Sequence, residues 1–189
     1  MNKKTIFPKI IFMGLFLASL GGFYFWHNDK DSSGLGGLLS WRGDSSNAKI
    51  LAGDAQTYDG GGTSDGSFSM KYPKDFTIQE FPIGEEGKKF VFESKDPGRG
   101  MEISVIPFDE SGSITPERIK QDLPDAVINN PQNVSIIEGV SALSFASTDE
   151  YIGDTFEVWF LHNGYLYQAT TYRAFASQME EMLKTMKFK

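Results

Sequence analysis

The sequence contains no cysteine, and among its 189 residues it has only two histidines. Without cysteine the chain forms no disulfide bond, holds no thiolate-bound metal ion and offers no cysteine nucleophile or lipidation site. A histidine that binds metal or acts as a general base needs partners held close by, and residues 67–189 contain His162 alone. We therefore predict no metal site, no cofactor and no catalytic residues, and we interpret His162 as a turn residue.

Basic residues are also scarce relative to acidic ones. The chain has 18 Lys and Arg against 25 Asp and Glu, a formal net charge of -7, and the acidic excess lies in residues 67–189. Nucleic-acid binding depends on Lys and Arg neutralising phosphates, so we expect no nucleic-acid partner. A hydrophobic content of 40% with 14% aromatics is nevertheless sufficient for a packed core.

The longest uncharged run of the N-terminal part, residues 10–26, follows Lys3, Lys4 and Lys9. As a helix it would be roughly 25 Å long, close to the thickness of a bilayer core. Aromatic residues end the run, as is typical of a membrane interface, and the lysines indicate a cytoplasmic N-terminus. We predict that residues 1–27 form a membrane anchor and that the following chain lies outside the cytoplasm.

The alternative is a signal peptide cleaved near Gly21, which would leave a secreted or periplasmic protein. Leu20 interrupts the small-residue pattern of a cleavage site, and the terminal aromatics fit an anchor better. We favour the anchor over the signal peptide.

Residues 28–66 are rich in Gly, Ser and Asp and are predicted to be a flexible linker, because they hold too little apolar surface to fold. The stretch DKDSSG, from Asp29, has the opening spacing of a calcium loop. However, Ser40 occupies the position of the bidentate glutamate, so we interpret the stretch as solvated linker.

From residue 67 the pattern becomes that of strands and two helices. Alternating or apolar runs bounded by turn signals predict strands at FSMKY, FTIQEF, KKFVFES, MEISVIPF and NVSIIEGVSALSFASTDE. Thr115 and Pro116 open a predicted helix that ends before Pro124. Ser177 and Glu180 have the spacing of a capping box at the start of a C-terminal helix.

Two apolar runs flank Asn163-Gly164, and this dipeptide predicts a hairpin with a two-residue turn. The implied register places one face against the core, and this face consists of Phe156, Val158, Phe160, Tyr167 and Ala169. The opposite face pairs Glu157 with Thr170 and Trp159 with Gln168.

This second face has two interpretations. Trp159, Gln168, Glu157 and Thr170 would form a binding patch, since a rigid aromatic beside hydrogen-bonding groups suits recognition. Alternatively, the helix near residues 115–123 covers the face and Trp159 belongs to the core.

Three stretches, FSMKYPKDF, EVWFLHNGYLYQATTY and MEEMLKTMKF, occur in this order over residues 67–189 and resemble the bacterial relatives of PsbP, the extrinsic protein of photosystem II. The resemblance implies an α+β fold, an α/β/α sandwich with a central antiparallel sheet, in residues 67–189. These motifs are structural, so they indicate fold more than activity. The metal-binding residues of plant members have no matching positions here.

Three classes of function remain. We favour a membrane-tethered, extracytoplasmic, non-catalytic module that binds another envelope protein or assists assembly. The alternatives are an envelope hydrolase with an unrecognised site and a passive surface or structural protein. A deep pocket lined by a Ser or Asp near a base would favour the hydrolase.

Overall fold

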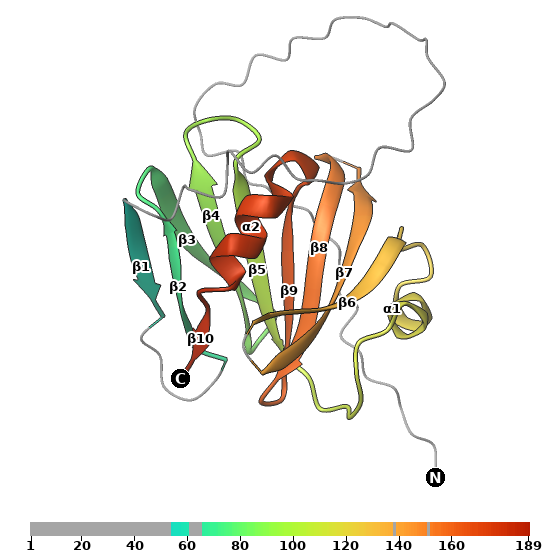
Figure 1. Cartoon of the computed structure of the whole chain (residues 1–189). Coiled ribbons are helices and arrows are strands. Elements are labelled where there is room, and N and C mark those ends of the chain that lie inside the picture. The colour runs from blue at the N-terminus through green and yellow to red at the C-terminus, as the bar shows by residue number, and fades with distance from the viewer. Residues whose placement is uncertain (1–53, 61–65, 138, 151) are drawn as a thin grey trace, which may run out of the picture.

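The computed structural model describes residues 54–60, 66–137, 139–150 and 152–189, which form two antiparallel sheets and a few short helices (Figure 1). The elements follow in the order β1 (Ala55–Asp59), β2 (Phe68–Pro73), β3 (Phe76–Ile83), β4 (Gly87–Ser94), β5 (Gly100–Pro107), α1 (Pro116–Asp122), β6 (Asn129–Ile137), β7 (Val140–Asp149), β8 (Gly153–His162), β9 (Tyr165–Tyr172), a 3-10 turn (Arg173–Phe175), α2 (Ala176–Leu183) and β10 (Lys187–Phe188).

The larger sheet has seven strands in the order β3-β4-β5-β9-β8-β7-β6, and all its described pairs are antiparallel. The predicted central antiparallel sheet is thereby confirmed. The smaller sheet has the order β1-β2-β10 and joins the beginning of the described chain to its C-terminal end. It was not predicted, because its outer strands are short.

The two faces of the large sheet have different coverings. One face packs against α2 and the small sheet around a large apolar core that contains Phe68, Phe92, Phe160, Tyr167, Met179 and Leu183. The opposite face packs against α1 through a smaller cluster of Ile114, Ile119, Leu143, Phe145, Trp159 and Leu166. With only 7 and 8 residues in α1 and α2, the helical layers are thin, and α1 covers part of one face.

β1 lies within the segment that was predicted to be linker, so the packed structure begins before residue 67. Its Tyr58 ring packs 5.5 Å from the ring of Phe68 and 5.6 Å from that of Phe90, measured between centroids. The Tyr58 hydroxyl donates a 2.8 Å hydrogen bond to Glu80 on β3. β1 also pairs along its length with β2. It has a single aromatic residue in a Gly- and Asp-rich stretch, which explains why the local pattern did not reveal it.

The two helices test the predicted caps with opposite results. Thr115 is the N-cap of α1, its hydroxyl accepts a 3.2 Å hydrogen bond from the backbone N–H of Arg118, and Pro116 is the first helical residue, as predicted. The capping box at Ser177 is wrong. The 3-10 turn runs directly into α2, the N-cap is Phe175, and none of the described side chains caps the helix.

The predicted anchor, residues 1–27, and most of the predicted linker lie outside the described residues. Among the helices that the structure does describe, none combines the length and apolar character needed to cross a bilayer.

Candidate functional site

The β8–β9 hairpin forms with the predicted register. Asn163 and Gly164 have φ values of 48° and 78°, the left-handed pair that a two-residue hairpin turn requires. Trp159 pairs with Gln168 and Glu157 pairs with Thr170. All four residues of the predicted patch therefore lie together on one face of the sheet.

These residues form a largely buried cluster on the face that α1 partly covers, so they do not form an open surface patch. Trp159 is 3% exposed and Glu157 is 1% exposed, while Thr170 is half-buried. Trp159 shares its apolar cluster with Ile119 of α1 and meets the Phe145 ring edge-on at 5.6 Å. The structure thus has the second of the two arrangements considered, with Trp159 in the core. Binding of a partner through this face stays a prediction.

Glu157 occupies the centre of the cluster and accepts three hydrogen bonds from neutral donors. The Thr155 hydroxyl donates to Oε1 at 3.0 Å, while Trp159 Nε1 and the Thr170 hydroxyl donate to Oε2 at 3.2 Å and 2.6 Å. Burial raises the pKa of the Glu157 carboxyl to about 7, against the opposing effect of the three hydrogen bonds, and the negative charge of Glu102 adds to the rise.

Glu102 lies next to this cluster on β5, directly opposite Thr170 of β9. Lys89 of β4 binds both carboxylate oxygens of Glu102 at 3.1 Å, and both side chains are largely buried. Burial raises the pKa of Glu102, although Lys89 acts to lower it. The ammonium group of Lys89 is therefore already paired with the Glu102 carboxylate.

Gln168 adds a polar group without a partner. It is buried, and its Nε2 atom has no hydrogen-bond acceptor among the described residues. Its paired neighbour on β5 is Ser104, which is also buried. An unsatisfied buried amide costs about 1 to 3 kcal/mol, so this position weakens the cluster.

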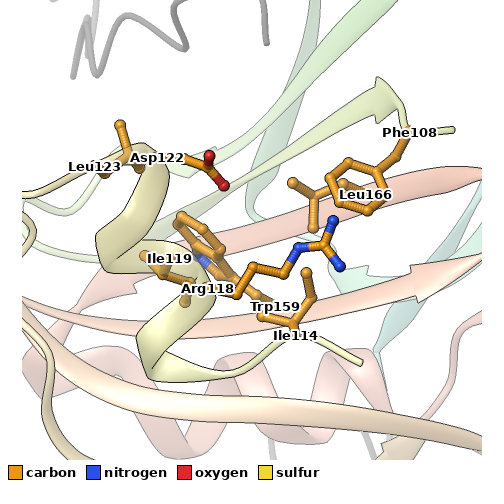
Figure 2. A pocket seen from close by; sticks show the side chains of 8 residues that line it. All are labelled: Phe108, Ile114, Arg118, Ile119, Asp122, Leu123, Trp159 and Leu166. Atoms are coloured by element: carbon orange, nitrogen blue, oxygen red, sulfur yellow. The ribbon is translucent and has the colours of Figure 1, made fainter. Parts of the chain in front are cut away.

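A small cavity lies between α1 and the sheet, with Trp159 and Leu166 as its floor (Figure 2). Its volume is about 20 Å³, which is room for about one water molecule. At its rim the Arg118 guanidinium lies 4.9 Å from the Phe108 ring centroid and forms an ion pair with Glu110. The lining includes Asp122 but neither a serine nor a histidine. This small cavity is therefore not the deep pocket, lined by a Ser or Asp near a base, that would favour a hydrolase.

His162 is part of the packing at the end of the hairpin. Its imidazole stacks on the Phe188 ring of β10, with 3.7 Å between centroids and 20° between planes. Burial lowers the pKa of His162. The side chain was expected to be solvated as a turn residue, whereas it is half-buried because the unpredicted strand β10 lies against it.

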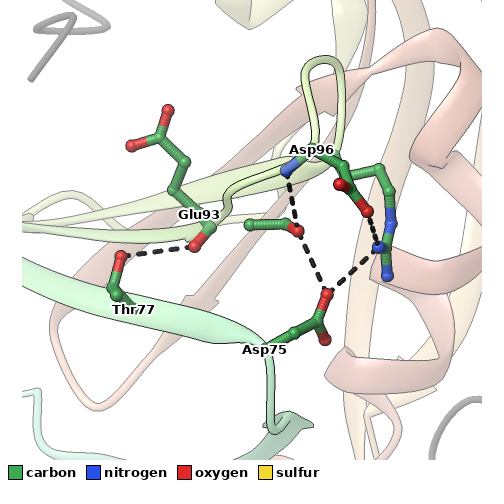
Figure 3. Close-up of polar contacts among 6 residues, drawn as sticks. Asp75, Thr77, Glu93 and Asp96 are labelled. Atoms are coloured by element: carbon green, nitrogen blue, oxygen red, sulfur yellow. Dashed lines mark hydrogen bonds and ion pairs between the residues drawn. The ribbon is translucent and has the colours of Figure 1, made fainter. Parts of the chain in front are cut away.

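A second polar network joins two turns at one end of the sheet (Figure 3). Arg99 bridges Asp75 at 3.1 Å and Asp96 at 2.8 Å, and the Ser94 hydroxyl donates to Asp75 at 3.1 Å. The guanidinium also lies 5.6 Å from the Phe76 ring centroid. This network fastens the β2–β3 turn to the β4–β5 turn. Neither here nor elsewhere in the described ranges do three His, Cys, Asp or Glu side chains gather in a way suited to a metal ion.

Part of the buried cluster could be predicted from the sequence. Thr155 lies two residues before Glu157, so strand alternation alone puts both side chains on the same face. Lys89 and Glu102 lie on the consecutive strands β4 and β5, which are distant in sequence from β8, and no local pattern specifies that β5 pairs with β9. Their place beside Glu157 could be found only from the folded chain.

No family model and no curated protein matches the sequence. Among solved structures, the solution structure of cyanobacterial PsbP (CyanoP) from Synechocystis sp. PCC 6803 is similar, with a TM-score of 0.50 and 10% sequence identity. The match covers 81% of this chain and 98% of that chain. The chain therefore has a PsbP-like fold, as the resemblance of its motifs implied.

Proposed function

We propose that this chain is a non-catalytic accessory or assembly module of the bacterial envelope. In this proposal residues 1–27 hold it in the membrane, the folded domain lies outside the cytoplasm, and its partner is another envelope protein. The uncharged run of residues 10–26 behind three lysines supports the tether.

The observation that carries the proposal is the PsbP-like fold together with its extent. The match spans 98% of the CyanoP chain, so the likeness concerns a whole domain and not a piece of a larger fold. The fold resembles that of PsbP, an extrinsic protein of photosystem II. This resemblance supports a role in contact with other proteins.

The hydrogen bonds and ion pair of the buried carboxyl groups also support a non-catalytic role. Both oxygens of Glu157 accept hydrogen bonds from side chains of the sheet, and the Glu102 carboxylate is held by Lys89. Catalytic acids and bases must be within reach of a substrate, whereas these two carboxyl groups are buried and bound to their own partners in the sheet. Their arrangement leaves neither carboxyl group available to a substrate.

Affinity purification of the full chain from native membranes tests the proposal. A C-terminally tagged full chain should retain one envelope protein reproducibly after chemical crosslinking. The control is a tagged chain of residues 1–66, which contains the predicted anchor and linker without the complete domain, and which should not retain this protein. Equal recovery with the control would place the contact outside the domain and contradict the proposal. Turnover of an envelope substrate by the full chain would contradict its non-catalytic part.

A further inference from the structure

Glu157 is a carboxyl group enclosed by the sheet, and no cation among the described residues contacts it. It lies on β8 between β7 and β9, and its paired neighbours are Phe145 on β7 and Thr170 on β9. The side chain is 1% exposed, and its three hydrogen-bond partners are all neutral. A buried carboxylate without a paired cation is costly, and such groups commonly relieve the cost by taking up a proton.

The surrounding charges do not remove this cost. On the same face, Lys89 of β4 is bound to Glu102 of β5, so the adjacent pair presents no free cation. By strand alternation, the other titratable groups on the same face of β4, β7 and β9 are Glu93, Asp149 and Tyr172. On α1, Arg118 and Asp122 line the cavity, whereas Glu117 and Lys120 are exposed. Arg118 is itself paired with Glu110.

The partners of Glu157 can accommodate both charge states without rearranging the sheet. A threonine hydroxyl donates to an ionised carboxylate, and by rotating it can accept from a protonated one. Thr170, at 2.6 Å, and Thr155, at 3.0 Å, are such partners. The Trp159 indole N–H, which only donates, still finds an unprotonated oxygen in either state. Thr170 is half-buried, so one partner of the carboxyl is partly accessible to solvent.

We propose that Glu157 is a reversible proton-binding site in the centre of the folded domain, coupled through Trp159 to the packing of α1. Proton binding converts the carboxylate and a solvent proton into a carboxylic acid and changes no other bond. The coupling follows from the double role of Trp159, whose Nε1 binds Glu157 and whose ring forms the floor beneath Ile119 of α1. A stronger hydrogen bond to the ionised carboxylate holds the indole differently from a weaker one to the neutral acid.

The direction of the electrostatic effects agrees with this geometry. Burial is the main cause that raises the pKa of Glu157, to about 7, and the charge of Glu102 acts in the same direction. The site therefore exchanges its proton close to neutral pH, whereas an exposed glutamate does so near 4.5. A change of about one pH unit around neutrality then shifts the charge state of the domain interior.

Direct titration by NMR tests the site. The side-chain carboxyl carbons of glutamate are labelled with ¹³C in the full-length protein in detergent, and the Glu157 signal is assigned through its backbone resonances. We expect the signal to titrate with a midpoint within about one unit of pH 7. A midpoint below about pH 5 would overturn the proposal, since it would show a glutamate that is ionised under ordinary conditions.

Two substitutions at Thr170 serve as a matched pair. Thr170→Val removes the shortest hydrogen bond to the carboxylate and should move the Glu157 midpoint upward, whereas Thr170→Ser keeps the hydroxyl and should leave the midpoint in place. A purely structural threonine would alter stability in the valine variant without moving the midpoint. Equal midpoints in both variants would contradict the role assigned to Thr170 in proton binding.

The coupling has its own readout in the Trp159 indole N–H resonance. Its chemical shift should follow pH with the same midpoint as the Glu157 carboxyl, and this dependence should disappear in Glu157→Gln. The glutamine amide retains the shape, and its carbonyl oxygen can still accept from Trp159. The coupling to α1 would be overturned if the indole chemical shift did not change with pH in the wild-type chain. It would also be overturned if the shift changed with pH in Glu157→Gln as it does in the wild type.

Discussion

Trp159 donates its indole N–H across 3.2 Å to Oε2 of Glu157, two residues earlier on the same strand. Alternation along β8 puts both side chains on the face that α1 covers. The largest apolar side chain beneath α1 is therefore bonded to a buried acid. Substitutions of these two residues consequently affect the same part of the domain in different ways.

Glu157→Gln should remove a pH dependence of stability. Between pH 4.5 and about 7 the folded domain holds a proton that the unfolded chain has released, because the pKa of Glu157 is raised on folding. The free energy of unfolding therefore decreases as pH rises through this window, by about 3 kcal/mol in total from Glu157. The measurement is urea unfolding of both proteins at pH 5 and pH 8. The wild type should lose more stability than the variant at the higher pH, and a larger loss in the variant would contradict the account.

Trp159→Ala should destabilise the domain by about 3 to 5 kcal/mol, since it removes a 3% exposed aromatic from the cluster beneath α1. Trp159→Phe is the control, because it keeps an aromatic ring while it loses the indole hydrogen bond and a smaller part of the packing volume. It should cost about 1 to 2 kcal/mol. Denaturant unfolding followed by circular dichroism measures both. An alanine variant with wild-type stability would restore the surface-patch interpretation.

The two threonine and serine positions expected to cap helices should behave differently. Thr115→Ala should cost about 1 kcal/mol, because it removes the hydroxyl that accepts from the backbone N–H of Arg118. Ser177→Ala should leave the free energy of unfolding unchanged, because Ser177 is exposed inside α2 and caps nothing. If thermal unfolding shows the reverse order, α2 begins elsewhere in solution.

His162→Ala should lower stability by about 1 kcal/mol through loss of the ring stack on Phe188. The pKa of His162 is lowered by burial, so the unfolded chain binds its proton more readily than the folded domain. The contribution of the neutral ring is therefore present above the unfolded pKa of about 6.5 and is lost as pH falls through the folded value. Phe188→Ala is the companion variant. If the losses from the two single variants simply add in the double variant, the stack makes no contribution of its own.

Local signals in the sequence predicted the parts of the fold that depend on a few adjacent residues. Asn163-Gly164 specified the hairpin and hence the pairing of Trp159 with Gln168, and Thr115 with Pro116 specified the start of α1. β10 was missed because its stability comes from pairing with β2, which is distant in sequence, and β1 was missed because its Gly- and Asp-rich surroundings gave no strand pattern. The burial of Trp159 depends on where α1 lies, and no periodicity encodes that position.

Crosslinking with a membrane-impermeant, lysine-reactive reagent on intact cells, or on spheroplasts where an outer membrane is present, tests the proposed function most directly. Lys88, Lys95 and Lys187 are exposed on the folded domain and can report on both its location and its contacts. We expect mass spectrometry to find these lysines joined to one and the same envelope protein without cell lysis. Reaction of these lysines only after lysis would contradict an extracytoplasmic domain, and reaction in intact cells without any link to a second protein would contradict a role in binding.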